Sequence, residues 1–112
     1  MVYSKTIFVP AGTQFSNPVE VQIPIWEQNI DSIDVKMDTV ASKGYLQLKI
    51  IFGDPEHQVY IWPRGVNDYI ISQGTWPESI HLPKAGLKAT ILGFSPQARE
   101  NHSAIVTIHT TG

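Results

Sequence analysis

Residues 44–63 read GYLQLKIIFGDPEHQVYIWP, and this stretch decides the fold. Its first half alternates in the period-two pattern of a strand with one buried face, and the inward set is Leu46, Leu48, Ile50 and Phe52. The segment Gly53–Glu56 has the composition of a turn, because glycine, aspartate and proline each favour turn conformations. A second strand follows from His57 to Trp62, and Pro63 ends it. The stretch therefore predicts an antiparallel β-hairpin.

Similar short segments recur along the rest of the chain, and signals for helices are almost absent. Gly, Pro, Asn, Asp and Ser separate segments rich in β-branched and aromatic residues about every ten residues. We expect strands at 3–9, 19–25, 31–39, 45–52, 57–62, 67–72, 78–82, 86–93 and 103–110. Eight to nine short strands with essentially no helix predict an all-β fold. The expected architecture is a single antiparallel β-sandwich domain, jelly-roll or immunoglobulin-like, over residues 1–112.

Two features of the strands refine this prediction. Pro24 lies inside the clearest alternation, at 19–25, and proline cannot donate to a strand ladder, so this strand should be an edge or carry a bulge. Apolar groups also occupy both faces of Tyr60–Trp62, Leu92–Phe94 and the strand around Ile105. A sandwich buries only one face of each strand. The second apolar face predicts either loop cover or a subunit interface, and we favour the interface.

The composition excludes several classes of function. The chain has 112 residues and no cysteine, which excludes disulfides, a thiolate nucleophile and a Cys-based zinc site. A net charge of −2, with eight scattered Lys and Arg residues, gives no electrostatic footprint for nucleic acid. No signal-peptide pattern and no membrane-spanning apolar run is visible. We expect synthesis in the cytoplasm, without nucleic-acid binding or membrane insertion.

No motif in the sequence predicts catalysis, a cofactor or a metal centre. A His-x-His pair and a Gly-x-Ser-x-Gly elbow are both absent, which leaves a cupin-like enzyme as the third of three hypotheses. The turn carboxylates of Asp54 and Glu56 are a candidate calcium pair, because turn carbonyls could supplement them. The histidines are scattered along the chain and are interpreted as surface or strand-end residues: His57, His81, His102 and His109.

Aromatic residues provide the candidate binding surface. The candidate interface or glycan contacts are Tyr60, Trp62, Arg64, Tyr69 and Trp76. Aromatic rings beside amide, acid and guanidinium groups can hold a sugar. Trp, Tyr and Arg are equally the residues enriched at protein-interface hot spots. A third interpretation is that the tryptophans cap the ends of the sandwich core, and the sequence leaves all three open.

Three pieces of the chain together carry a resemblance. They are an opening strand into PAGT followed by SNPVEVQIPI, the central GYLQLKIIFGDPEHQVYIWPRGVNDYI, and the closing ENHSAIVTIHTT. This order resembles small jelly-roll-like β-sandwich proteins of tailed viruses, which decorate heads or build tails and spikes. The resemblance implies a non-enzymatic virion component that forms a symmetric homo-oligomer or binds other structural proteins, and it transfers no functional residue. The alternative is a small carbohydrate-binding module that uses surface aromatics.

Overall fold

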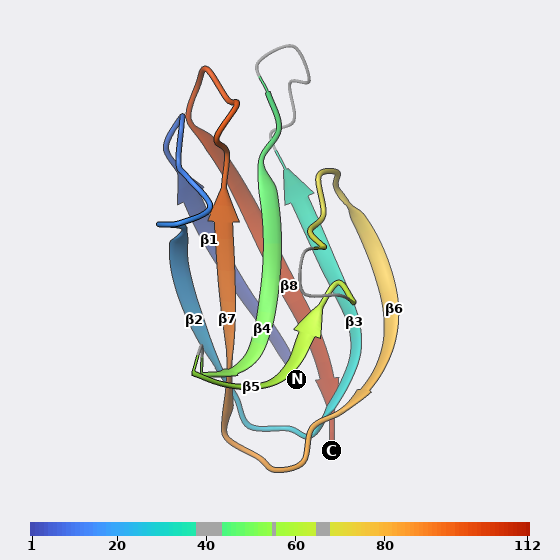
Figure 1. The fold of residues 1–112 in the computed structure, drawn as a ribbon. Helices are drawn as coiled ribbons and strands as arrows, with labels where there is room; N and C mark the ends of the chain where they lie inside the picture. The colour runs from blue at the N-terminus through green and yellow to red at the C-terminus, as the bar shows by residue number, and fades with distance from the viewer. Residues whose placement is uncertain (38–43, 55, 65–67) are drawn as a thin grey trace.

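The computed structural model describes residues 1–37, 44–54, 56–64 and 68–112. These residues form strands and turns with no helix, so the predicted all-β class is confirmed, and none of the described chain is a helix able to cross a membrane. The strands in the described residues (Figure 1) are β1 (Val2–Val9), β2 (Val19–Ile25), β3 (Asn29–Met37), β4 (Gln47–Asp54), β5 (His57–Trp62), β6 (Gly74–His81), β7 (Leu87–Phe94) and β8 (His102–Thr111).

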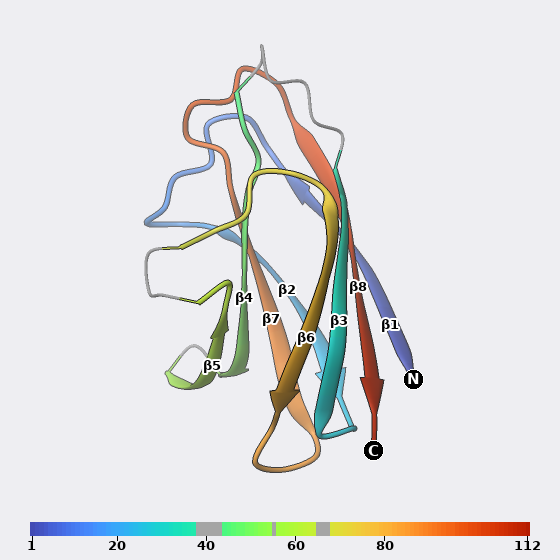
Figure 2. The same ribbon diagram turned by 90° about the vertical axis from the view of Figure 1, so that its right-hand side faces the viewer.

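The strands form two four-stranded antiparallel sheets that pack face to face (Figure 2). One sheet has the order β1-β8-β3-β6 and the other has the order β2-β7-β4-β5. Strand β1 pairs with β8, β2 with β7, β3 with β6, and β4 with β5, as in one long hairpin rolled up on itself. This arrangement is a jelly roll, one of the two sandwich types expected. The hairpin predicted at residues 44–63 forms β4 and β5, the closed end of this long hairpin.

The core lies between the two sheets and follows the alternation in the sequence. The four inward residues of the strand predicted at 45–52 are all fully buried: Leu46, Leu48, Ile50 and Phe52. The expectation for Pro24 is also confirmed, because β2 lies at the edge of its sheet. There Pro24 lies opposite Lys88 of β7, and the free side of an edge strand tolerates a residue without an N–H group.

Two expected strands differ from the structure. Within the described part of 67–72, only Ile70 is paired, in an isolated bridge to Leu48 of β4. Strand β6 begins at Gly74 rather than at residue 78, and it includes Trp76 and Pro77. It is also an edge strand, so Pro77 is tolerated there. The expected strand positions 38, 39 and 67, and turn residue 55, lie outside the described residues.

Candidate functional site

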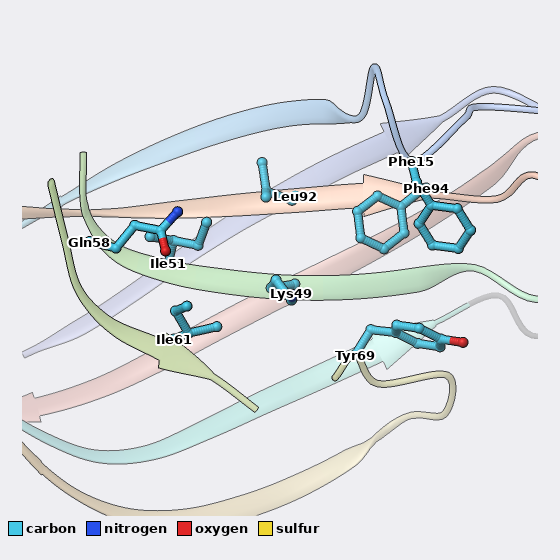
Figure 3. A pocket seen from close by; sticks show the side chains of 8 residues that line it. All are labelled: Phe15, Lys49, Ile51, Gln58, Ile61, Tyr69, Leu92 and Phe94. Carbon is cyan, nitrogen blue, oxygen red and sulfur yellow. The ribbon is translucent and has the colours of Figure 1, made fainter. Parts of the chain in front are cut away.

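The outer face of the β2-β7-β4-β5 sheet carries an open groove with a volume of about 500 Å³. We call it the outer groove (Figure 3). Side chains of three neighbouring strands form its floor, and two loops contribute side chains at one end, on the right in Figure 3. The lining residues are Phe15, Lys49, Ile51, Gln58, Ile61, Tyr69, Leu92 and Phe94.

Strand alternation explains why apolar side chains reach this outer face. On β4, Ile51 lies between the core residues Ile50 and Phe52 and therefore points to the opposite side of the sheet. On β7, Leu92 and Phe94 alternate with the core residue Ile91 in the same way. The outward apolar groups of β7 thus meet Ile51 and Ile61 in one place, whereas Ile105, which the sequence also marked as part of a second apolar face, is exposed on the opposite sheet.

Two loops place Phe15 and Tyr69 at one end of the outer groove. There the two rings form an aromatic cluster with Phe94 of β7. The ring centroids of Phe15 and Phe94 are 4.7 Å apart, and Tyr69 meets Phe94 edge to face at 6.3 Å. Phe94 is only 6% exposed beneath the two loop residues, whereas Phe15 and Tyr69 remain 52% and 40% exposed. Loop cover is therefore real but incomplete. Away from this cluster, the side chains of Leu92 and Ile61 are half-buried.

Hydrogen bonds to the end of β7 hold the loop that carries Phe15. The Ser95 hydroxyl donates to the carbonyl oxygen of Pro10 at 2.9 Å, and the Gly12 N–H donates to the carbonyl oxygen of Ser95 at 3.1 Å. The Ala11 N–H donates to the side-chain oxygen of Asn101 at 3.0 Å. These bonds place the loop beside Phe94, so the position of Phe15 is built into the fold.

A different pairing places Tyr69. Strand β5 ends at Trp62, and beyond that point Ile70 pairs with β4 instead. The N–H groups of Ile70 and Leu48 each donate to the other residue's carbonyl oxygen, at 2.9 Å and 3.0 Å. Ile70 is itself buried in the core, so its neighbour Tyr69 is turned toward the outer groove.

Lys49 introduces a positive charge into the middle of this apolar surface. Among the described residues that line the outer groove, Lys49 alone is charged at neutral pH. Burial of its side chain lowers the pKa of Lys49, and the nearby carboxylate of Asp68 partly opposes that effect. Asp68 is exposed and directly precedes the lining residue Tyr69 in the chain. The surface thus combines aromatic and aliphatic groups with one cation on its floor.

The structure brings two of the predicted site residues, Trp62 and Trp76, together within the core. Trp62 is 2% exposed and Trp76 is partly buried against the core cluster. Their rings meet nearly perpendicularly, with centroids 5.4 Å apart, and the Trp62 indole N–H donates to Glu78 Oε1 at 2.9 Å. In this chain the pair closes the side of the sandwich where the edge strands β5 and β6 face each other (Figure 2).

The other three predicted residues lie apart from one another. Tyr60 is partly buried and its ring packs near Phe52, at a centroid distance of 6.4 Å. Arg64 is exposed after the end of β5. Only Tyr69 lines the outer groove. The sequence interpretation missed Lys49 and Gln58 as parts of this surface. The outward parity of Lys49 on β4 was visible, but Gln58 shares the parity of the core residue Trp62 and lines the groove beyond a register shift in the β4–β5 pairing.

The outer face of the opposite sheet carries many polar side chains beside the exposed apolar residues Phe8 and Ile105. There His109 Nε2 lies 2.8 Å from Asp34 Oδ2, and the hydroxyls of Ser4 and Thr107 lie 3.0 Å apart. The Thr75 hydroxyl, followed by the His109 imidazole, lowers the pKa of Asp34, so this carboxyl is ionised at neutral pH. In the part of the chain that the structure describes, no three His, Asp or Glu residues gather as a metal site. The side chain of Asp54, in the candidate calcium pair, lies outside the described residues.

Comparisons with known proteins identify no family for this chain. No protein-family model matches the chain, and no curated protein matches it. One of the solved structures found in the comparison is a Bacillus endospore appendage from a family of disulfide-linked pili. It is 16% identical, has a TM-score of 0.37, and is matched over 100% of this chain and 88% of its own. So distant a similarity transfers neither an activity nor a partner to this chain.

Proposed function

We propose that this chain is a non-enzymatic structural subunit that self-associates through the outer groove. The observation that carries the proposal is the incomplete loop cover of an apolar sheet face. Leu92 and Ile61 are half-buried on the floor, and the aromatic cluster beside them is open to solvent on two of its three rings. Concave, aromatic-rich surfaces of this kind are typical of protein interfaces.

Charge supports a second copy of the chain as the occupant. The outer groove holds Lys49 on its floor, and the carboxylate of Asp68, one residue before the lining residue Tyr69, acts on the charge of Lys49. A surface that meets its own copy about a two-fold axis must be self-complementary, and a surface with one charge of each sign satisfies that requirement. A partner of strongly acidic or basic character would leave one of the two charges facing its own sign.

We further propose that this structural subunit is a component of a virion head, tail or spike. That part is supported by the resemblance of the PAGT, GYLQLKIIFGD and ENHSAIVTIHTT segments to small virion sandwiches, and by the jelly-roll strand order, which occurs in capsid domains. The fold alone does not define a function, so the proposal depends on the outer groove.

Light scattering behind a sizing column, at two protein concentrations, tests self-association. We expect an oligomer that survives dilution, and we expect Leu92→Glu to convert it to a monomer by placing a carboxylate in the groove. The matched control is Ile105→Glu, which adds the same charge at a 44% exposed apolar residue of the opposite sheet and should leave the oligomer intact. A wild-type mass of 12.5 kDa at both concentrations would overturn the proposal.

A carbohydrate-binding module is the second candidate function, and one observation favours it. Phe15 and Tyr69 keep much of their ring surface exposed in a groove that also contains the ammonium of Lys49 and, at its other end, the amide of Gln58 (Figure 3). Sugar rings stack on such faces while their hydroxyls bind polar groups. Calorimetric titration with maltoheptaose and chitotetraose tests this candidate: saturable heat that Tyr69→Ala abolishes supports it, and no heat with either glycan counts against it. Tryptophan fluorescence is a poor reporter here, because Trp62 is buried away from this face.

A further inference from the structure

We propose that the outer face of the β1-β8-β3-β6 sheet binds a neutral saccharide in a groove of hydroxyl and imidazole groups. This groove has a volume of about 750 Å³, and we call it the polar groove. Seven of the ten described residues that line it are polar, among them Ser4, Asp34, Thr75, Thr107 and His109. The inference goes beyond the proposed function and does not depend on it, because the outer groove lies on the other sheet.

Strand register places four hydrogen-bonding side chains in one row across the whole sheet. Ser4 of β1 lies opposite Thr107 of β8. Asp34 of β3 lies opposite Thr107 on one side and opposite Thr75 of β6 on the other. Neighbouring strands are about 4.8 Å apart, so a row over four strands extends for about 14 Å. A ligand with several hydroxyl groups along its length matches such a row better than a compact ion does.

The hydroxyls of Ser4 and Thr107 retain hydrogen-bonding capacity. Their oxygens are 3.0 Å apart, so one hydroxyl donates to the other. Each hydroxyl has one donor and two acceptor positions, and this single bond leaves one O–H donor and acceptor positions on both oxygens. Sugar hydroxyls also donate and accept at once, so they can satisfy both kinds of position.

His109 adds an acceptor of fixed orientation beside this row. Its Nε2 lies 2.8 Å from Asp34 Oδ2, and the ionised carboxylate can only accept, so the Nε2–H group is the donor. In the neutral imidazole this leaves Nδ1 as an acceptor. The side chain lines the polar groove and is 38% exposed. The neutral ring can therefore accept a hydrogen bond from a sugar hydroxyl through Nδ1.

The charges of the polar groove favour a neutral ligand. Asp34 contributes a negative charge, and Lys36, two residues along the same face of β3, contributes a positive one. An anion would lie beside the carboxylate, and a cation would lie beside the ammonium group. Ile105 is 44% exposed opposite Lys36 on β8 and gives the groove an apolar surface. A saccharide combines hydroxyls with apolar C–H faces, so it suits this mixture of groups.

Two-dimensional ¹H–¹⁵N NMR spectra of the full chain test the site, with maltoheptaose, chitotetraose and mannopentaose as the probes. Each sugar is added to about 10 mM, which fills most of a site whose Kd is about 1 mM. We expect at least one of the three sugars to shift the amide signals of Asp34, Thr75 and Thr107 saturably. The signals of Phe15 and Tyr69, in the outer groove, should not move.

Valine substitutions remove single hydroxyls from the row. Thr107→Val and Thr75→Val keep the β-branched shape that strands favour, and circular dichroism melts establish that each variant folds. Each should weaken binding of the sugar at least about tenfold, the scale of one lost hydrogen bond. Thr6→Val is the matched control, because Thr6 is exposed on the same face of β1 as Ser4 but is not among the residues that line the polar groove. It should leave the affinity unchanged.

Each other outcome overturns the inference. No saturable shift with any of the three sugars, or unchanged affinity in both valine variants, shows that the row does not bind them. Shifts confined to Phe15 and Tyr69 would assign the sugar to the outer groove instead. If sodium phosphate or L-arginine shifts the row and no sugar does, the groove is an ion site. The proposed self-association is measured separately by light scattering, so a monomer that binds sugar through this row would overturn the proposed function alone.

Discussion

Trp62 of β5 and Trp76 of β6 meet edge to face at 5.4 Å, although their strands belong to different sheets. Both strands are sheet edges, and neither pairs with the other. The indole pair therefore closes the sandwich by side-chain packing on the side where no backbone ladder can do so. The hydrogen bond from Trp62 to Glu78 satisfies the one polar group of the buried indole.

This relationship predicts that Trp62 contributes chiefly to folding stability. Trp62→Ala should lower the free energy of unfolding by about 3–5 kcal/mol, because it leaves a large cavity between the sheets. Urea denaturation followed by circular dichroism measures the change. Arg64→Ala, two residues away and exposed, is the control and should change stability by less than about 0.5 kcal/mol. A Trp62→Ala protein with wild-type stability but no self-association would instead make Trp62 an interface residue.

Local patterns were enough to predict most of the fold. The bounds of β2 match those expected from the alternation of Val19 to Ile25, and Pro24 correctly indicated an edge. The strand expected at 67–72 failed for a non-local reason. Its apolar residues resemble a strand, but β4 has β7 along one side and β5 along the other, so Ile70 makes only a single bridge beyond the end of β5.

The candidate site was less accessible from sequence. The outward parity of Leu92 and Phe94 was visible, and it predicted either loop cover or a subunit interface, with the interface favoured. The structure shows partial loop cover, and the interface stays a prediction. Which loops provide that cover depends on contacts between residues far apart in the chain, such as Phe15 with Phe94. Local periodicity contains no information on such contacts. The same limit applies to Trp62 and Trp76, because their strand-end positions suit a surface and a core equally well.

The close packing around Gly93 predicts that a larger residue at this position destabilises the fold. A Cβ atom at this position of β7 would lie 2.5 Å from Val9 Cγ2 and 3.1 Å from Ile7 Cδ1. Gly93→Ala should therefore destabilise the fold by about 1–3 kcal/mol, the usual cost of overpacking. Val9→Ala removes the methyl group in closest contact, so the double variant should lose less stability than the sum of the single variants. Urea denaturation of the four proteins measures this coupling, and strictly additive losses would contradict the contact.

The hydrogen bonds to Glu27 predict that the fold loses stability in acid. The Thr110 hydroxyl donates to Glu27 Oε1 at 2.7 Å and the Tyr3 hydroxyl donates to the same oxygen at 2.8 Å, and both bonds lower the pKa of this carboxyl. A carboxyl whose pKa is lower in the folded state stabilises the fold above its unfolded pKa, and that contribution disappears as pH falls through the folded pKa.

The comparison of wild type with Glu27→Gln isolates this contribution. Thermal unfolding between pH 7 and pH 2.5 should show the wild type as the more stable protein near neutrality. The gap should close below the ordinary glutamate pKa of about 4.5. The acid sensitivity that comes from other carboxyls, such as Asp34, is common to both proteins. A gap that stays constant over the whole range would show that these hydrogen bonds do not depend on the charge of Glu27.

Substitution of Phe15 tests whether the aromatic cluster serves as loop cover or as part of an interface. If its ring only covers Phe94, Phe15→Ala should reduce the free energy of unfolding and leave self-association unchanged. Because Phe15 remains 52% exposed, we expect a stability loss of about 1 kcal/mol, the scale of one aromatic pair. We expect a larger effect on association, since truncation of an aromatic anchor in an interface costs about 2 kcal/mol or more.

Phe8→Ala is the matched control, because Phe8 is 71% exposed on β1 of the opposite sheet. It removes the same side chain outside the outer groove and should leave the dissociation constant unchanged. Sedimentation equilibrium measures association for both variants, and urea denaturation of each protein measures stability. A Phe15→Ala protein that loses several kcal/mol of stability but associates like the wild type would assign the cluster to loop cover alone. If Phe8→Ala weakens association as much as Phe15→Ala does, the interface includes the outer face of the opposite sheet.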